Sequence, residues 1–498
     1  MTITQKTYPQ AVSEFLVDTK LMYINGQWVP SSANKTYYSI NPATNEVIAT
    51  IYEGDATDVD LAVKAARAAF ATWKKTAPIE RAAKLNKLAD LVERDADIIA
   101  FIESLDYGGT IGTTRYGFVE SAIKHLRYYA GYATKLYGKT LELTTGGNIH
   151  AYTKREPLGV CGQITSWNFP ISGATWKIAA PVAAGNTVVL KPSQQTSLTT
   201  LYLAKLIDEA GFPPGVINVV TGSGSKLGEA ITSHPDIDKI GFTGSTVVGK
   251  RIMEKSSRNL KKLTLELGGK SPNIIFADAK LDKAIQFAIS AIFTNQGQVC
   301  AAGSRLYIER PVYEQVKEQL ITAVRSLKVG DPFDPETKIG PLVSKEQLKT
   351  VTGYVESARQ DGATIIVGGG QPTDPELAKG NYYLPTLIEG LDENCSAVAE
   401  EIFGPVLVLM PFDSLEEIVE RANLTEYGLA AGVWTQNLQT AHYMIEHLEA
   451  GQVWVNGYFM NDDNIPLTGF KQSGFGSEMG QEGIEAYTKI KSVAINLD

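Results

Sequence analysis

The chain has 498 residues and a mass of 54.0 kDa, which at about 150 residues per domain predicts roughly two to four domains. Hydrophobic residues make up 44% of it and charged residues 20%, so an intrinsically disordered protein is excluded. The net charge is −9, and an acidic protein is not expected to bind nucleic acid or an anionic membrane.

Cysteine and histidine are scarce in this sequence. The closest histidines, His442 and His447, are five residues apart and would not share a helix face, so no metal site is predicted. The N-terminus has no apolar run of signal-peptide length, and the run 178–190 is too short to cross a bilayer. We therefore expect a cytoplasmic protein without a disulfide framework, in which the three cysteines are Cys161, Cys300 and Cys395.

The first 136 residues predict short strands followed by helices. Asn25 and Gly26 stand between two apolar runs, which is a strong signal for a β-hairpin. From Asp58 onward the apolar residues follow helical spacing, as at Ala62 and Ala66.

The middle of the chain alternates between apolar strands and helices, which predicts a parallel sheet covered on both faces, as in dinucleotide-binding domains. The predicted strands are 159–164, 186–192, 216–222, 239–244, 263–269 and 273–278, and the predicted helices are 170–184, 197–210, 224–232 and 245–257. A second α/β region follows, with predicted strands at 304–310, 364–369, 405–412, 430–435 and 452–457. The polar segment 139–155 predicts a protruding two-stranded ribbon, and 492–497 is expected to pair with a similar edge.

Four local patterns suggest chemistry. Cys300 lies in the loop NQGQVCAAGSR between a helix and a strand, and Glu266 occupies an otherwise apolar strand. Asn168 follows a strand in SWNFP, and Gly244 and Ser245 begin a helix whose free N–H groups suit a phosphate. Each pattern alone also has an ordinary structural explanation, such as a buried thiol, an edge strand or a turn.

The patterns belong to a larger set of motifs, which are WNFP, VVLKPS, GFTGST, LELGGKSPNI, NQGQVCAAGSR, EEIFGPV and KQSGFG. In this order and spacing the chain resembles the aldehyde dehydrogenase superfamily over nearly its whole length, and most of all its bacterial broad-range and phenylacetaldehyde-type members. The resemblance implies a Rossmann-like α/β cofactor domain at 1–136 and 158–268, an α/β catalytic domain at 269–466, and a β-ribbon at 137–157 and 480–498. The ribbon is expected to mediate a homodimer or homotetramer.

The resemblance also implies a catalytic mechanism. The Cys300 thiolate attacks the aldehyde, and the oxyanion is held by the Asn168 side-chain amide and the Cys300 backbone N–H. After hydride transfer, Glu266 activates the water that hydrolyses the thioester to a carboxylic acid. By the same resemblance, Lys177 is expected to tune Glu266 and Asn168.

An NAD or NADP cofactor follows from the resemblance. The matching positions are Lys191 and Glu401 at the riboses, Phe403 near the nicotinamide, Gly244 and Ser245 at the pyrophosphate, Gly224 and Val248 at the adenine, and Ile164, Thr165, Ser166, Trp167, Ser193 and Leu267 as further contacts. Many NAD-specific members have glutamate where this chain has Gln194. That difference removes a charge that would exclude NADP, and Lys226 is expected nearby, so we expect use of both cofactors.

The expected substrate tunnel departs from the pattern of related enzymes. Phe169 and Trp176 remain, whereas positions that are often aromatic or bulky are smaller or more polar here, namely Gly173, Thr294, Asn461 and Leu467. We therefore expect a small or medium aldehyde as substrate, with aromatic aldehydes among the candidates. Two alternatives stay open: a CoA-acylating dehydrogenase, against which Glu266 argues, and an inert protein on the same fold, against which Cys300, Asn168 and Glu266 argue.

Overall fold

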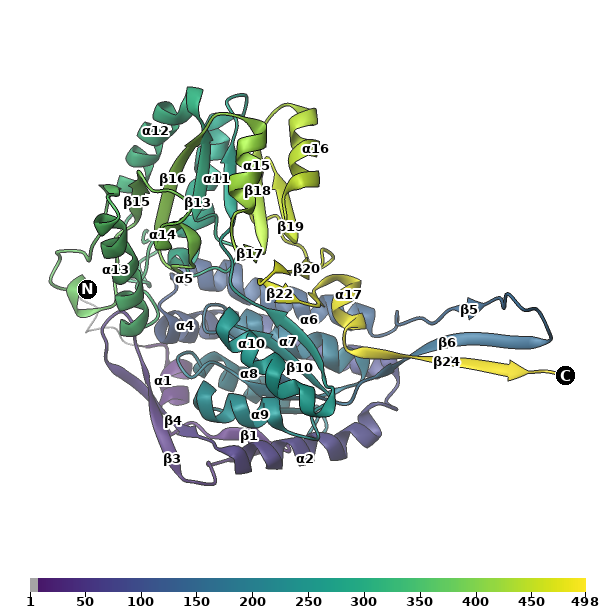
Figure 1. Cartoon of the computed structure of the whole chain (residues 1–498). Coiled ribbons are helices and arrows are strands. Elements are labelled where there is room, and N and C mark those ends of the chain that lie inside the picture. The colour runs from purple at the N-terminus through teal and green to yellow at the C-terminus, as the bar shows by residue number, and fades with distance from the viewer. Residues whose placement is uncertain (1–7) are drawn as a thin grey trace.

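The computed structural model describes residues 8–498, so the first seven residues of the expected cofactor domain lie outside the described residues. Its first layer is an eight-stranded sheet in the order β2-β1-β9-β8-β7-β10-β11-β22, in the lower half of Figure 1. The strands from β9 to β11 are parallel, and β1 and β22 pair with them in antiparallel fashion at either side. The bounds are β1 (Met22–Ile24), β2 (Gln27–Val29), β7 (Val160–Ile164), β8 (Thr187–Lys191), β9 (Ile217–Val219), β10 (Lys239–Thr243), β11 (Lys262–Glu266) and β22 (Gly474–Phe475).

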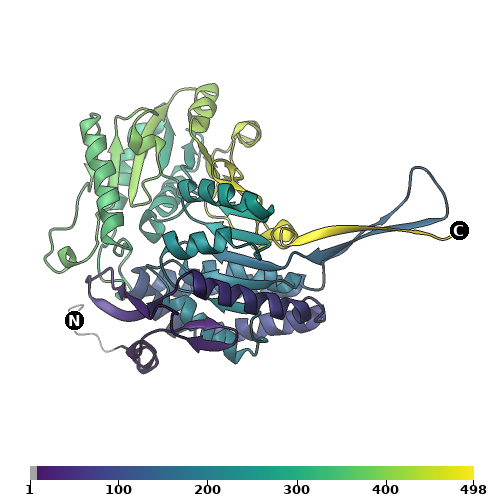
Figure 2. The ribbon, with the colours of Figure 1, turned by 60° about the horizontal axis from the view of Figure 1, so that its bottom comes forward.

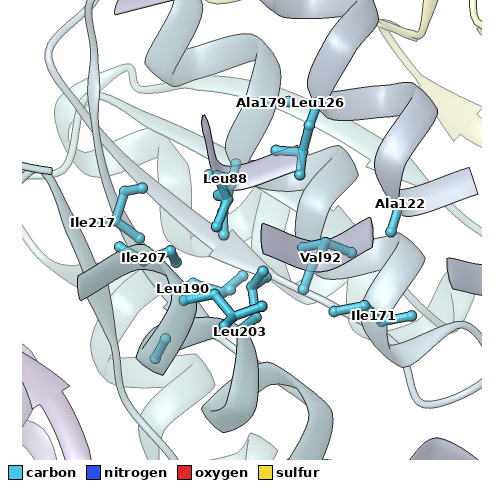
Figure 3. Close-up of a cluster of buried hydrophobic side chains, with 14 of the residues drawn as sticks. Leu88, Val92, Ala122, Leu126, Ile171, Ala179, Leu190, Leu203, Ile207 and Ile217 are labelled. Atoms are coloured by element: carbon cyan, nitrogen blue, oxygen red, sulfur yellow. The ribbon is translucent and has the colours of Figure 1, made fainter. Parts of the chain in front are cut away.

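Helices cover both faces of this sheet because its strands are apolar on both sides. In β8, Val188 and Leu190 point into one core, and Val189 points into the core on the opposite face. The larger core is shown in Figure 3, where Leu190 and Ile217 pack with side chains from several helices. The helices of this half are α1 (Gln10–Val17), α2 (Ala56–Trp73), α3 (Pro78–Arg94), α4 (Ala96–Tyr107), α5 (Ile111–Thr113), α6 (Glu120–Tyr132), α7 (Pro170–Ala184), α8 (Leu198–Glu209), α9 (Glu229–Ser233) and α10 (Thr246–Ser256).

The local signals at the start of the chain are confirmed. Asn25 and Gly26 have φ values of 54° and 72°, as a tight hairpin turn between β1 and β2 requires. The strands β3 (Lys35–Ile40) and β4 (Val47–Glu53) form a second antiparallel pair. The predicted helix 224–232 is present but begins as a short π-helix over Gly224–Gly228 before α9.

A second sheet has seven strands in the order β14-β15-β16-β13-β12-β18-β19 and lies above the first in Figure 1. Its bounds are β12 (Pro272–Ile275), β13 (Arg305–Glu309), β14 (Thr364–Val367), β15 (Thr386–Glu389), β16 (Val406–Phe412), β18 (Ala430–Trp434) and β19 (Gln452–Val455). All neighbours are parallel except β14, which is antiparallel to β15. The flanking helices are α11 (Leu281–Phe293), α12 (Tyr313–Arg325), α13 (Lys345–Gln360), α14 (Ser396–Ala399), α15 (Leu415–Asn423) and α16 (Leu438–His447).

A β-ribbon projects from the body of the molecule, as Figures 1 and 2 show. It has three strands instead of the two predicted for 139–155, because β24 (Thr488–Asn496) pairs along β6 (Ile149–Pro157), which also pairs with the short β5 (Thr140–Leu141). The segment 480–498 begins with helix α17 (Gly480–Glu485), which contacts α7. Two short pairs complete the chain: β17 (Tyr427–Gly428) with β21 (Phe470–Lys471), and β20 (Leu467–Thr468) with β23 (Ser477–Glu478).

Within residues 8–498, no helix combines the length and the apolar character that crossing a membrane would need.

Candidate active site

The carboxyl ends of the parallel strands of the first sheet meet along one edge. In the strand register, Ile164 at the end of β7 lies beside Lys191 at the end of β8, and Thr243 of β10 lies beside Glu266 of β11. The loops that follow these strands therefore start side by side. Ligands bind at this edge in open α/β sheets, so the register gathers distant motifs at one place.

A cavity of about 720 Å³ opens at this edge and is lined by most of the predicted site residues. They are the proposed catalytic residues Asn168, Glu266 and Cys300, the cofactor candidates Thr165, Ser166, Trp167, Gly244, Ser245, Leu267, Glu401 and Phe403, and the substrate candidates Phe169, Gly173, Trp176, Thr294, Asn461 and Leu467. Seven predicted site residues do not line this cavity: Ile164, Lys177, Lys191, Ser193, Gln194, Gly224 and Val248. Of these, Lys177 is buried within α7, and the other six lie on or after β7, β8, β9 and β10.

Cys300 is half-buried in the loop between α11 and β13. Burial, reinforced by the negative charges of Glu266 and Glu401, raises the pKa of its thiol to about 12, while the backbone N–H groups of Cys300 and Ala301 oppose the shift. These surroundings favour the neutral thiol. Attack on a carbonyl therefore requires that the thiol first lose its proton.

The side chain of Asn168 is held in one orientation. Its Nδ2 donates a hydrogen bond to the Gln298 carbonyl at 2.9 Å, and its Oδ1 accepts one from the Ser166 hydroxyl at 2.7 Å. An amide Nδ2 carries two hydrogens, so a second one remains for an oxyanion in the cavity. Asn168 is buried and lies two residues before the start of α7, so the position of its backbone is restrained as well.

Glu266 is a buried carboxyl group at the end of β11, with 3% of its surface exposed. Within the described part of the chain, neither carboxylate oxygen has a hydrogen-bond partner. Burial raises the pKa of Glu266 well above its usual value, and the charge of Glu478 adds to the shift, whereas the charge of Lys177 opposes it. A carboxylate with a raised pKa and no partner is a strong proton acceptor, so Glu266 suits a general base.

Lys177 has a partner that the sequence did not indicate. Its Nζ forms a buried ion pair with Oε1 of Glu478 on β23, 301 residues further along the chain. Both partners act on Glu266 through charge: Glu478 raises the pKa of Glu266, and Lys177 opposes that rise. No local pattern in the segment around Glu478 could reveal this pairing, because only the fold brings the two residues together.

The two glycines after Leu267 allow close backbone approach, as their position in the sequence predicts. A Cβ at Gly269 would lie 2.3 Å from the Cys300 carbonyl, and one at Gly268 would lie 2.7 Å from Oε2 of Glu401. Glu401 accepts a hydrogen bond from the Gly269 N–H at 3.0 Å, and burial raises its pKa to about 7.

Several other side chains line the cavity and were missed by sequence reasoning. They are Phe118, Ser121, Lys124, His125, Ser172, Val299, Ala301, Gln347, Phe459 and Asp463. His125 is buried on α6, and its Nε2 lies 3.3 Å from Oδ1 of Asp463. Burial lowers the pKa of His125 to about 4, so the ring is neutral at pH 7. The aromatic and acidic run from 458 to 463 was the one sequence signal for the lining residues Phe459 and Asp463.

Comparison with known proteins assigns the family. Residues 28–493 match the model of the Aldehyde dehydrogenase family. The chain belongs to the aldehyde dehydrogenase family. It is 46% identical to mitochondrial aldehyde dehydrogenase of Mesocricetus auratus, over 96% of this chain and 95% of that one, and 46% identical to cytosolic aldehyde dehydrogenase 1 of Rattus norvegicus, over 99% and 98%. Among solved structures, the NAD+ complex of aldehyde dehydrogenase from Bacillus cereus is 45% identical, covers 99% of both chains and superimposes with a TM-score of 0.96.

Two expectations from the sequence are thereby confirmed. The protein is an aldehyde dehydrogenase, an oxidoreductase, and it has the aldehyde dehydrogenase fold with its two α/β sheets. The phenylacetaldehyde-type resemblance and the roles of individual residues stay predictions.

Proposed function

We propose that this aldehyde dehydrogenase oxidises a small or medium aldehyde to its carboxylic acid with NAD+ and water, through a thiohemiacetal and then a thioester on Cys300. The observation that supports this most strongly is that Cys300, Asn168 and Glu266 line one cavity, where the Glu266 carboxylate has no hydrogen-bond partner among the described residues. The similar Bacillus cereus enzyme forms an NAD+ complex, which supports the choice of cofactor.

The residues at the sheet edge fit a dinucleotide. Lys191 presents a buried ammonium group and Glu401 a half-buried carboxylate, and both suit ribose hydroxyls. Burial lowers the pKa of Lys191 to about 8, and its Nζ donates to the Pro192 carbonyl at 2.8 Å. Ser245 caps the eleven-residue helix α10, whose N-terminus suits the pyrophosphate. Bound NAD+ would supply the hydride acceptor.

The protein groups then divide the chemistry between them. The Cys300 thiol gives its proton to water in the cavity, and the thiolate sulfur attacks the aldehyde carbon as the carbonyl oxygen becomes an oxyanion. The free N–H of Asn168 and the backbone N–H of Cys300 stabilise that oxyanion. In the second half of the reaction, Glu266 takes a proton from water, the hydroxide adds to the thioester carbon, and the Cys300 thiolate leaves.

We assign the cofactor domain to 1–136 and 158–268, the catalytic domain to 269–466, and the oligomer contact to the ribbon at 137–157 and 480–498. Apolar side chains on the projecting ribbon support this last assignment, since Ile490 is 63% exposed and the outer edge of β24 is unpaired within the described chain. A homodimer or homotetramer in the cytoplasm follows from this proposal.

One assay tests the function. The purified enzyme should form NADH from NAD+ and an aldehyde without CoA, and release the free acid. Formation of NADH only in the presence of CoA would assign it to the acylating class. No NADH or NADPH with a panel of aldehydes would support the inert alternative.

Cofactor preference is expected to depend on Gln194. Because this side chain is neutral, we expect the enzyme to use both NAD and NADP. Lys226 could attract a 2′-phosphate, and its Nζ lies 3.8 Å from Oε1 of Glu53. Gln194→Glu should weaken NADP relative to NAD by about 1–3 kcal/mol, or roughly tenfold to a hundredfold, because like charges repel at a partly solvated site. Fluorescence titration with both cofactors measures the shift. The matched control is Gln195→Glu, which adds the same charge one residue further along, and equal shifts in both variants would refute the role of Gln194.

Substrate range is expected to favour longer or aromatic aldehydes. Gly173, Thr294, Asn461 and Leu467, which are smaller or more polar than the residues often found at these positions, line the cavity. A short aldehyde would not reach these walls. Each methylene group no longer buried would weaken binding by about 0.8 kcal/mol, or roughly fourfold in affinity. We expect kcat/KM to rise from acetaldehyde to hexanal, benzaldehyde and phenylacetaldehyde. The alternative is that neighbouring loops fill this space, and acetaldehyde as the best substrate would establish it.

A substitution at Gly173 sharpens this test. A Cβ there would lie 3.9 Å from Thr165, which is ordinary contact, so Gly173→Leu can extend into the cavity without a clash at its base. This variant should shift the preference toward short aldehydes. Gly131→Leu is the control, since Gly131 is also a helical glycine with open space around it but does not line the cavity.

A further inference from the structure

Tyr107 is a fully buried tyrosine at the end of α4, directly behind the cavity wall. Its ring centroid lies 6.3 Å from that of Trp167 and 6.2 Å from that of Phe118, and both of these rings line the cavity. Its hydroxyl has two partners on the segment that precedes Cys300. It donates to Oδ1 of Asn295 at 2.8 Å and accepts from Nε2 of Gln298 at 2.9 Å.

The direction of these hydrogen bonds is set by the backbone. The Val343 N–H can only donate, and it donates to Oε1 of Gln298 at 3.1 Å, so Nε2 of Gln298 must face Tyr107. The Tyr107 hydroxyl accepts there, and its own proton goes to Oδ1 of Asn295. Asn295 therefore presents Nδ2 to two carbonyls, that of Asn168 at 3.0 Å and that of Gln298 at 3.4 Å.

This network ends at the side-chain amide of Asn168, which we propose stabilises the oxyanion. The Gln298 carbonyl that accepts from Asn295 also accepts from Nδ2 of Asn168 at 2.9 Å. Asn168 is thus held at its side chain by the carbonyl of Gln298 and at its backbone by Asn295. Together with the Ser166 hydroxyl at Oδ1, this arrangement directs the remaining hydrogen of the Asn168 amide into the cavity.

The segment that carries the network needs such support. Asn295 and Gln296 have φ values of +57° and +56°, in the left-handed region that residues other than glycine rarely adopt. Gln296 is held by Gly108 and Pro341, to whose carbonyls its Nε2 donates at 3.1 and 3.0 Å. For Asn295, the Tyr107 hydroxyl supplies the hydrogen bond to Oδ1.

We propose that Tyr107 is a positioning residue for the oxyanion hole, which orients Asn168 through the side chains of Asn295 and Gln298. It contacts neither substrate nor cofactor and exchanges no proton in the reaction. The proposal rests on the proposed function, because it assumes that Asn168 stabilises an oxyanion on the Cys300 adduct.

The test is Tyr107→Phe, which keeps the buried ring and removes only the hydroxyl. In rapid mixing with NAD+ and hexanal, we expect the rate constant of the NADH burst to fall about 10-fold to 100-fold. Small misplacements of catalytic groups cause losses of this size. The Kd for NAD+ should stay within about twofold, since the cofactor contacts are not altered. A burst rate within about threefold of wild type would overturn the proposal.

Two further measurements separate positioning from general damage. Alkylation of Cys300 by iodoacetamide forms no oxyanion, so its rate should be unchanged in Tyr107→Phe, and slowing equal to that of the burst would overturn the proposal. In the Asn168→Ala background, Tyr107→Phe should have little additional effect, because the group it orients is gone. Full multiplication of the two effects would also overturn it.

Matched variants complete the design. Tyr382→Phe removes another fully buried hydroxyl, one without a hydrogen-bond partner among the described residues, and should leave the burst unchanged. Should Tyr107→Phe not fold, Asn295→Asp replaces it, because aspartate keeps the shape, tolerates the left-handed backbone and cannot donate to the two carbonyls. The same loss of burst rate is expected, and a normal burst would refute the network. An inactive wild-type enzyme would instead refute the proposed function itself.

Discussion

Replacing Cys300 with alanine is expected to abolish dehydrogenase turnover while NAD+ binding persists. The reaction that we propose passes entirely through a bond to the Cys300 sulfur, and Cys300→Ala removes that atom with little change in shape. Loss of the nucleophile should lower kcat by about 10⁴-fold or more, a magnitude typical of nucleophile removal. Steady-state assays measure the loss, and fluorescence titration with NADH measures the retained binding.

The chain provides a matched control in Cys395. This thiol is also half-buried, but it precedes the short helix α14 and does not line the cavity. Cys395→Ala should therefore retain wild-type turnover. Substantial activity in Cys300→Ala would refute the covalent route, whereas loss of activity in both variants would indicate a general effect of removing thiols.

The second large effect is expected at Glu266. Glu266→Gln keeps the shape of the side chain but removes the proton acceptor, so thioester hydrolysis should slow by about 10²-fold to 10⁴-fold. We expect a burst of NADH at roughly one equivalent of enzyme, followed by very slow turnover, in a rapid-mixing experiment. A normal steady-state rate after the burst would mean that another group activates the water.

The pH dependence provides a second readout of the same residue. Glu266 accepts a proton only when ionised, and burial raises its pKa, so in the wild type the hydrolysis rate should rise with pH through that raised pKa. Glu266→Gln should lose this rise. Glu103→Gln is the control, because Glu103 is another fully buried carboxyl whose pKa burial raises, to about 8, but it lies outside the cavity.

Much of the half that contains the first sheet was predictable because its signals are local. The predicted helix 170–184 matches α7, which has proline at its first position and a left-handed glycine, Gly185, directly after its end. The predicted strands β7, β8, β10 and β11 have apolar centres and are buried over most of their length, as strands covered on both faces must be. Such patterns involve only a few neighbouring residues and can therefore be recognised in the sequence.

The second half shows where local reasoning fails. Strand β15 (Thr386–Glu389) was not predicted, since four residues carry too little pattern and their conformation depends on pairing with β14 and β16. The C-terminal strand was expected to pair with an edge, but its partner β6 and the register over nine residue pairs came from the structure. Pairing between segments more than 300 residues apart leaves no local trace.

By itself, the sequence determined the α/β class, the order of most elements, the family resemblance, and the residue types Cys300, Glu266 and Asn168 as candidates for the chemistry. Only the tertiary structure decided what surrounds them: the ion pair between Lys177 and Glu478, the burial that raises the pKa of Glu266, and the hydrogen bonds from Tyr107. The reason is physical. A side chain's identity is local, but its burial, charge environment and orientation depend on neighbours that only the packed chain supplies.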